Sequence, residues 1–344
     1  MTVQSISTKK KKVDFIYDNA LYFIIGALVL AIIIAEPTFV RLKNVTTILT
    51  QSATRIIYAC GVAGIIVLGG TDLALGRLVG LAGVVAASLL QAATYFQRVF
   101  SVEVIPELNI FIPMLLVMVL IGSISAIHGW IVARFSVAPF IASMGVQLVA
   151  YGICLQYFNS VCRSTPLSGF TESYSAFCQD SVKVVEGFNL SYLIFYALIV
   201  VAIMWVVWNR TNLGKNMFAI GGNREAAKVC GVNVKHTIII IYAIAGLLYA
   251  FGGVLEVGRV GSANGTMGAD YAMDAIAACV VGGVSMKGGT GTIPGVVIGV
   301  IIFQIISYGL IYVGISPDLQ FVIKGLIIIL AVILDNLKTI RKAA

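Results

Sequence analysis

Long runs of apolar residues, separated by short polar stretches, dominate the chain. An α-helix needs about 20 apolar residues to cross a bilayer. Several runs are shorter than that, and glycines flank them, which is typical of broken or tilted helices buried inside a bundle. We predict ten membrane spans: Leu21–Ala35, Ile56–Leu68, Leu78–Phe96, Ile110–Val132, Val137–Phe158, Leu190–Trp208, Thr237–Val257, Ala272–Val284, Ile293–Val313 and Leu319–Leu334.

The composition favours a membrane protein over a soluble one. Hydrophobic residues make up 59% of the 344 residues and charged residues 11%, where about 45–50% and about 25% are usual in soluble domains. The 35 glycines also suit membrane helices. We therefore expect an all-α, polytopic membrane protein with about ten transmembrane helices. A secreted disulfide scaffold, a disordered chain and a nucleic-acid-binding protein are excluded on the same grounds.

The charged residues predict the orientation of the chain. Ten spans place both termini on one side of the membrane, and basic loops lie in the cytoplasm. Basic residues precede the first span, follow the last, and gather between residues 209 and 236. We predict cytoplasmic tails at residues 1–18 and 339–344 around a transmembrane domain at 19–338. The net charge of +8 then reports orientation and is not evidence for an anionic partner.

The cysteines do not form a disulfide framework. Cys60, Cys154 and Cys279 lie in apolar spans, where cysteine serves as a small core residue. Cys162 and Cys178 share the long segment that is predicted to lie outside the membrane. An oxidising compartment leaves two alternatives open for this pair, a disulfide or two free thiols.

Two glycine-rich segments resemble each other. Each predicts a helix, a tight glycine turn and a second helix packed closely through small residues. The likeness has two explanations, a duplicated helical unit as in many transporters or the shared composition of glycine-rich membrane helices. The turn residues are Gly69, Gly70, Asp72 and Gly76 in the first segment and Gly282, Gly283, Gly288, Gly289 and Gly291 in the second.

The chain lacks the motifs of an enzyme. Its two histidines, His128 and His236, have no metal-ligand spacing. It has no G-x-x-x-x-G-K-[ST] loop to hold ATP and no G-x-S-x-G or H-E-x-x-H motif. We therefore expect a non-catalytic chain that binds no cofactor or metal of its own.

Charged residues within the spans are few. We expect Asp274 to be the one embedded acid, with Arg55 and Lys324 as the embedded bases. Asp274 follows a loop and opens an apolar run, which favours an interfacial helix N-terminus where a carboxylate meets free N–H groups. The alternative is a proton relay, which usually needs several acids or histidines within the membrane.

The segment between the sixth and seventh spans predicts a short exposed helix. Asn223 is a good N-cap, and Gly231 suits the left-handed position after the helix. Glu225 in the first turn and Lys228 in the last complement the helix dipole. A helix of about two turns is marginal in water by itself, so we expect this one to dock on a partner; the alternative is an ordinary connector.

At this segment the chain resembles the inner-membrane permease subunits of bacterial ABC importers of the ribose/galactose type. The resemblance extends from about Pro37 to the C-terminus. The first 35 residues match poorly, and the segment from Asn159 to Gly187 contains Cys162 and Cys178, which are not associated with the family. The matching strings are Ile48–Ser52, Gly70–Arg77, Val137–Phe140, Gly214–Asn223, Glu225–Asn233 and Asp274–Gly283.

The resemblance implies a fold, a location and a set of partners. It implies an importer of a monosaccharide of the galactose, methyl galactoside or glucose class, in the bacterial inner membrane with both termini cytoplasmic. Two permease copies would enclose the path, a separate subunit would bind ATP and magnesium, and a sugar-binding protein would dock outside. The short helix would then be the coupling helix, formed by Asn223, Arg224, Glu225, Ala226, Ala227, Lys228, Val229 and Gly231.

Two other functions remain open from the sequence. An ion-coupled secondary transporter of a small polar solute is the main alternative, and a membrane-embedded enzyme or scaffold is the other. Arg163 and Arg259 are candidates for pairing with acids of a binding protein. Candidate residues for the transport path are Gln147, Gln156, Gln304 and Ser307, for which interhelical hydrogen bonds are the alternative role.

Overall fold

Each of the ten predicted apolar runs coincides with a helix in the computed structural model of the chain, which describes residues 20–185 and 188–343. The predicted N-terminal tail at 1–18 lies outside the described residues. The helices are α2 (Ala20–Ala35), α3 (Leu42–Val67), α4 (Leu75–Leu89), α5 (Phe111–Phe135), α6 (Pro139–Ser160), α7 (Glu172–Gln179), α8 (Tyr192–Arg210), α9 (Asn212–Gly222), α10 (Arg224–Val229), α11 (Val234–Val260), α12 (Tyr271–Val281), α13 (Ile293–Tyr312) and α14 (Pro317–Ala343). A 3₁₀ helix, η1 (Pro37–Val40), joins α2 to α3, and a hairpin of β1 (Ser181–Val185) and β2 (Phe188–Ser191) precedes α8.

Among the described residues, six helices are long and apolar enough to cross a membrane by length and composition, namely α3, α5, α6, α8, α11 and α13. Three shorter apolar helices accompany them: residues 26–35 of α2, α4 and α12. The fold is therefore mostly helical with several candidate spans. The count of about ten transmembrane helices remains a prediction.

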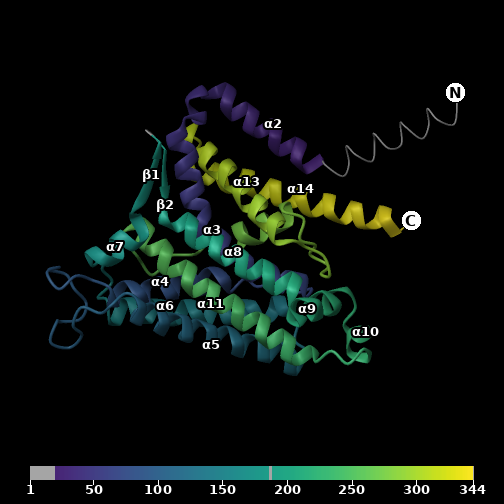
Figure 1. Ribbon diagram of the computed structural model, residues 1–344, viewed down its shortest axis with the longest axis horizontal. Coiled ribbons are helices and arrows are strands. Elements are labelled where there is room, and N and C mark those ends of the chain that lie inside the picture. The colour runs from purple at the N-terminus through teal and green to yellow at the C-terminus, as the bar shows by residue number, and fades with distance from the viewer. Residues whose placement is uncertain (1–19, 186–187, 344) are drawn as a thin grey trace.

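Helix α3 lies between two groups of helices (Figure 1). In the first group, α11 packs against α4 and α5, and α6 packs against α4. In the second group, α13 packs against α12 and α2, and α14 contacts α12. Because α3 contacts α11 as well as α12 and α13, it touches both halves of the molecule.

The core forms where α3, α4, α5 and α11 meet. Tyr58, Tyr242 and Tyr249 are the largest of its fully buried side chains. The outer faces of α5, α6 and α8 instead expose large apolar residues, such as Leu115 and Leu148. A helix with its backbone satisfied internally and apolar side chains outside suits a hydrocarbon environment.

Three helix boundaries differ clearly from the predicted ones. α14 continues to Ala343, beyond the predicted Leu334 and into the predicted tail at 339–344. α3 begins at Leu42, well before the predicted Ile56, because threonines and a glutamine interrupt the apolar pattern of its first half. α4 ends at Leu89 rather than Phe96, and irregular backbone follows it. The β1–β2 hairpin and α7 lie in the long polar segment for which no structure was predicted.

The two ends of the molecule differ in what they carry. The start of α2 and the end of α14 lie toward the same end as α9 and α10, whereas α7 and the hairpin lie toward the opposite end (Figure 1). We call these the α10 end and the hairpin end. All six cysteines are free, and Cys162 and Cys178 are both buried thiols, so the disulfide alternative is not formed.

Candidate functional site

The short helix α10 carries the caps that its sequence predicts. The Oδ1 atom of Asn223 accepts the N–H of Ala226 at 2.9 Å. At the other end Gly231 takes a φ of 82°, and the N–H of Val232 donates to the carbonyl of Ala227 at 3.0 Å. This pair of features is a Schellman turn. The capping residues next to α10 in the sequence therefore determine both ends of this helix.

The side chains of α10 divide into an inner and an outer set. Ala227 is buried and packs on the chain's own core. Val229 is 88% exposed, which is unusual for a valine. The predicted coupling residues that are exposed are Asn223, Arg224, Glu225, Ala226, Lys228, Val229 and Gly231. A helix of six residues with an apolar tip in solvent has the form of a docking element.

Behind α10, the end of α9 is locked between the two glycine turns. The N–H of Gly289 in the second turn donates to the carbonyl of Val67, which precedes the first turn, at 2.8 Å. Gly221 of α9 lies against both groups, because a Cβ added there would collide with the Val67 carbonyl and the Gly289 amide. A Cβ at Gly288 would likewise collide with Gly69 and Gly221. Three separate segments thus meet backbone to backbone.

The two glycine turns share one backbone geometry. Gly69 and Gly283 both take a φ of 83° directly after their helices. In each, the next residue donates back to the helix, from Gly70 to the carbonyl of Ile65 at 3.0 Å and from Val284 to that of Cys279 at 2.9 Å. Gly69 therefore corresponds to Gly283 in backbone geometry, and Gly70 to Val284.

The helices that follow the two turns pack differently. Gly295 and Gly299 of α13 lie against the end of α12, as the sequence predicts for a helix, a turn and a helix. Gly76 and Gly80 of α4 lie instead against Met267 and Gly268, in the segment before α12. The close packing predicted between α3 and α4 through these glycines was wrong. The duplicated unit remains a prediction.

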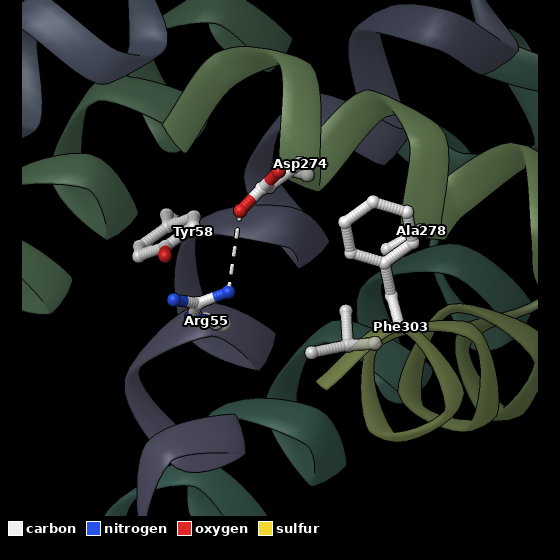
Figure 2. Close-up of a pocket in the computed structure, with 7 residues that line it drawn as sticks. Arg55, Tyr58, Asp274, Ala278 and Phe303 are labelled. Atoms are coloured by element: carbon white, nitrogen blue, oxygen red, sulfur yellow. Dashed lines mark hydrogen bonds and ion pairs between the residues drawn. The ribbon is translucent and has the colours of Figure 1, made fainter. Parts of the chain in front are cut away.

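Asp274 lies at the centre of a buried ion-pair cluster (Figure 2). One carboxylate oxygen is 3.3 Å from a guanidinium nitrogen of Arg55 on α3 and 3.0 Å from the ammonium of Lys324 on α14. Tyr58 and Phe303 line the same small cavity. Asp274 is in the first turn of α12, as predicted, but its side chain pairs with two cations from other helices.

A second buried carboxylate was missed by the sequence analysis. Glu256 of α11 is 2% exposed and forms two hydrogen bonds with Arg259, at 2.7 and 3.0 Å. It also accepts the hydroxyls of Thr54 at 2.6 Å and Tyr271 at 3.2 Å. The expectation that Asp274 is the one embedded acid was therefore wrong. Glu256 already lies within the predicted span Thr237–Val257, so the sequence alone could have identified it.

Asp72 of the first glycine turn is also fully buried. It accepts the N–H of Ala74 at 2.9 Å and the hydroxyl of Tyr249 at 3.1 Å. The ring of His128 lies 3.9 Å from its carboxylate. Asp72 therefore fixes the start of α4 against α5 and α11, which explains a polar residue in an otherwise glycine-rich turn.

The remaining predicted residues fall into different settings. Arg163 is exposed at the hairpin end, whereas the guanidinium of Arg259 is held by Glu256. Gln304 is buried and donates to Gln51 of α3 at 2.5 Å, which is the interhelical role left open for it. Gln147 is half-buried and Gln156 exposed on α6, and Ser307 is buried in α13.

Comparison with known proteins agrees with this architecture. A family model described as the permease component of a branched-chain amino acid transport system matches residues 44–332. The chain is 51% identical over 342 residues to the galactose/methyl galactoside import permease of Escherichia coli K12, covering 98% of this chain and 99% of that one. It is 34% identical to the ribose import permease of the same organism, over 98% of this chain and 100% of that one.

A more distant relative has the same name as the first. The galactose/methyl galactoside import permease of Treponema pallidum is 38% identical over 96% of this chain and 64% of its own length. No solved structure matches the chain. The extent of these matches shows that the chain belongs to the family of membrane-spanning transport-system permease components.

Proposed function

We propose that this chain is the permease subunit of an ATP-driven importer that takes up a monosaccharide of the galactose, methyl galactoside or glucose class. The observation that carries the proposal is the 51% identity over nearly the full length to a permease named for galactose and methyl galactoside. The family description names branched-chain amino acids, and a ribose permease is 34% identical. The sugar is therefore inferred from the full-length relatives and not from the family.

The energy for transport would come from a separate ATP-binding subunit. α10 is the element suited to contact that subunit, because its exposed Val229 and basic residues form a protruding surface. A groove of about 460 Å³ beside α10, lined by Arg224, Glu225, Lys228 and Lys235 among others, would accept polar groups of the partner. ATP and magnesium would be bound by that partner, and this chain would bind no cofactor.

α9 would transmit a displacement of α10 to the candidate membrane-spanning helices. Because Gly221 is interlocked with Val67 and Gly289, a displacement of α9 shifts the ends of α3 and α12–α13 together. α3 makes polar contacts in the interior with both of these helices, through Arg55 with Asp274 of α12 and through Gln51 with Gln304 of α13. In the assembled importer two copies of the chain would enclose the path, with the α10 end and both termini in the cytoplasm.

An ion-coupled transporter is the competing function, since Asp72, Glu256 and Asp274 are all buried. Asp274 is matched by two cations and Glu256 by Arg259, while Asp72 accepts hydrogen bonds from the N–H of Ala74 and the hydroxyl of Tyr249. A carboxylate that carries protons must be able to lose its partner, and ion pairs within the membrane resist this. The pairs therefore favour a structural role for these acids.

Reconstitution tests the proposal directly. The permease would be placed in lipid vesicles with its partner ATP-binding subunit, and the sugar-binding protein and labelled galactose would be added outside. We expect uptake only when ATP is enclosed and both partners are present. Uptake by the permease alone under a proton or sodium gradient would instead establish the ion-coupled function.

A further inference from the structure

A polar groove opens at the hairpin end, on the opposite side of the molecule from α10. It has a volume of about 400 Å³, within the range of roughly 300–1,000 Å³ typical of small-molecule sites. Three elements form it: the first turns of α3, the β1–β2 hairpin with the end of α7, and the end of α11. The polar residues that line it include Thr47, Thr50, Gln51, Asn189, Ser191 and Arg259.

The chemistry of this lining matches a neutral sugar ring. Its groups are mainly hydroxyls and amides. The hydroxyls of Thr47 and Thr50 donate to the carbonyls of Lys43 and Thr46 and can still accept. The amide nitrogen of Gln51, whose oxygen accepts from Gln304, can still donate. A sugar hydroxyl both donates and accepts, so these groups can satisfy it without bringing a charge into the membrane. The one charged side chain described in the lining, Arg259, is held in place by two hydrogen bonds to Glu256 and presents a fixed group to the groove.

The groove continues into the protein as a polar face of α3. Thr47, Gln51, Arg55 and Tyr58 are spaced by three or four residues and so lie on one face of the helix. The first three are only half-buried. Polar side chains at this depth are costly in a membrane and mark water-filled routes for substrates. Thr47 and Gln51 are among the polar residues that interrupt the apolar pattern in the first half of α3, so the predicted span did not include that half.

This polar face ends at the Asp274 cluster. There the ion pairs of Asp274 with Arg55 and Lys324 leave a cavity of only about 10 Å³, room for about one water molecule. The ring of Tyr58 stacks on that of Tyr271 at a centroid distance of 5.7 Å. The polar face of α3 therefore begins at an open groove and ends at a cavity that is nearly filled.

We propose that the groove is the site where the permease receives the sugar released by its binding protein, and that Thr47, Thr50, Gln51 and Asn189 hold the sugar hydroxyls. The proposal rests on the proposed function and adds the residues that meet the substrate. It separates two roles along α3. The neutral groups near the hairpin end bind the sugar, and the ion pairs of Asp274, farther along the helix, close the path.

The test uses the complete importer in vesicles, with enclosed ATP, both partners and labelled galactose. Gln51→Leu and Thr50→Val keep the side-chain size and remove the polar groups. We expect each to raise the KM for galactose by at least about fivefold, the loss of roughly one hydrogen bond, while ATPase activity stimulated by the binding protein persists. Gln97→Leu, at an exposed amide in the loop between α4 and α5, is the matched control and should leave KM unchanged.

A second measurement does not depend on transport by an altered site. Thr47→Cys would be introduced together with Cys230→Ser, which removes the exposed native thiol. We expect a membrane-impermeant maleimide added outside to label residue 47, and saturating galactose to slow that labelling severalfold; mannitol, a linear polyol, should not.

The outcomes separate the two proposals. If the wild-type importer carries galactose but Gln51→Leu and Thr50→Val keep a normal KM, or galactose leaves the labelling unchanged, the groove is not a sugar site. If the wild-type importer with both partners carries no galactose, the proposed function itself is overturned, and the groove assignment with it.

Discussion

The N–H of Gly289 donates a hydrogen bond to the carbonyl of Val67 at 2.8 Å. These residues belong to different glycine turns, and Gly221 at the end of α9 lies against both. Contacts between backbones cannot adjust by changing a rotamer, so the three segments move together or the contact breaks. At this junction α9, which leads into α10, meets both α3 and the loop between α12 and α13 through tight backbone contacts.

Adding a methyl group at this junction should damage it. In Gly221→Ala the new Cβ collides with the Val67 carbonyl and the Gly289 amide, so we expect a loss of stability of about 1–3 kcal/mol. Sugar transport should fall more than ATP hydrolysis, because force from α10 no longer reaches the turns. Thermal unfolding in detergent and uptake in vesicles measure the two effects.

The neighbouring glycine provides a matched control. A Cβ at Gly222 has no atom within 4 Å, so Gly222→Ala should keep both stability and transport. Alanine has a higher helix propensity than glycine, so propensity alone cannot cause a loss, and equal losses in the two variants would mean that the interlock does not explain the result.

Features that depend on residues close in sequence, such as helix caps, could be predicted. Features that depend on contacts between distant segments could not. Asn223 and Gly231 cap α10 as expected, because capping involves only neighbouring backbone groups. The first half of α3 was missed because its polar residues face a groove formed by distant segments. Glu256 lies within the predicted span Thr237–Val257 and could have been identified, but its partners Thr54 and Tyr271 come from other helices, and no pattern along α11 predicts them.

The exposed valine of α10 should contribute to binding of the ATP-binding subunit. Val229 is 88% exposed and Ala227 is buried, so only the former is available to a partner. We expect Val229→Asp to weaken binding by roughly tenfold or more, as for a central contact of an interface, with no change in thermal unfolding. Ala227→Leu should instead lower stability, because it overpacks the chain's own core.

Surface plasmon resonance with the purified partner measures the affinity, and Val102→Asp is the control. Val102 is exposed too, but it lies in the loop between α4 and α5, remote in sequence from α10. If Val229→Asp binds as the wild type does, α10 does not dock through its tip.

Cysteine labelling should report the same surface without any substitution. Cys230 is exposed and the other five cysteines are buried. At the hairpin end, burial raises the pKa of the Cys178 thiol to about 12 and that of Cys162 to about 11. The thiolate is the reactive form, so both stay protonated and slow to react at pH 7–9.

We therefore expect maleimide at pH 7.5 to modify Cys230 at least about ten times faster than Cys162 or Cys178, as measured by peptide mass spectrometry. Binding of the ATP-binding subunit should protect Cys230. Raising the pH from 7 to 9 should leave Cys178 largely unmodified, because its pKa lies above that range. Rapid labelling of Cys178 at neutral pH would contradict its burial.

Removing the Asp274 carboxylate should destabilise the protein by leaving two cations without a partner. Arg55 and Lys324 both pair with it, and all three side chains are mostly buried. Breaking a buried pair by removing one partner costs about 3–5 kcal/mol, so Asp274→Ala should unfold at a clearly lower temperature than the wild type. Asp270→Asn, an exposed acid one turn earlier, should have no such effect.

A double-mutant cycle distinguishes loss of the ion pairs from loss of side-chain packing. If unpaired charge is the cause, Asp274→Ala combined with Lys324→Met should be more stable than Asp274→Ala alone, because one of the two unmatched cations is gone. Additive losses would show that the two side chains act independently. In that case the cluster would not hold α14 to α12, and the closed end of the polar face of α3 would need another explanation.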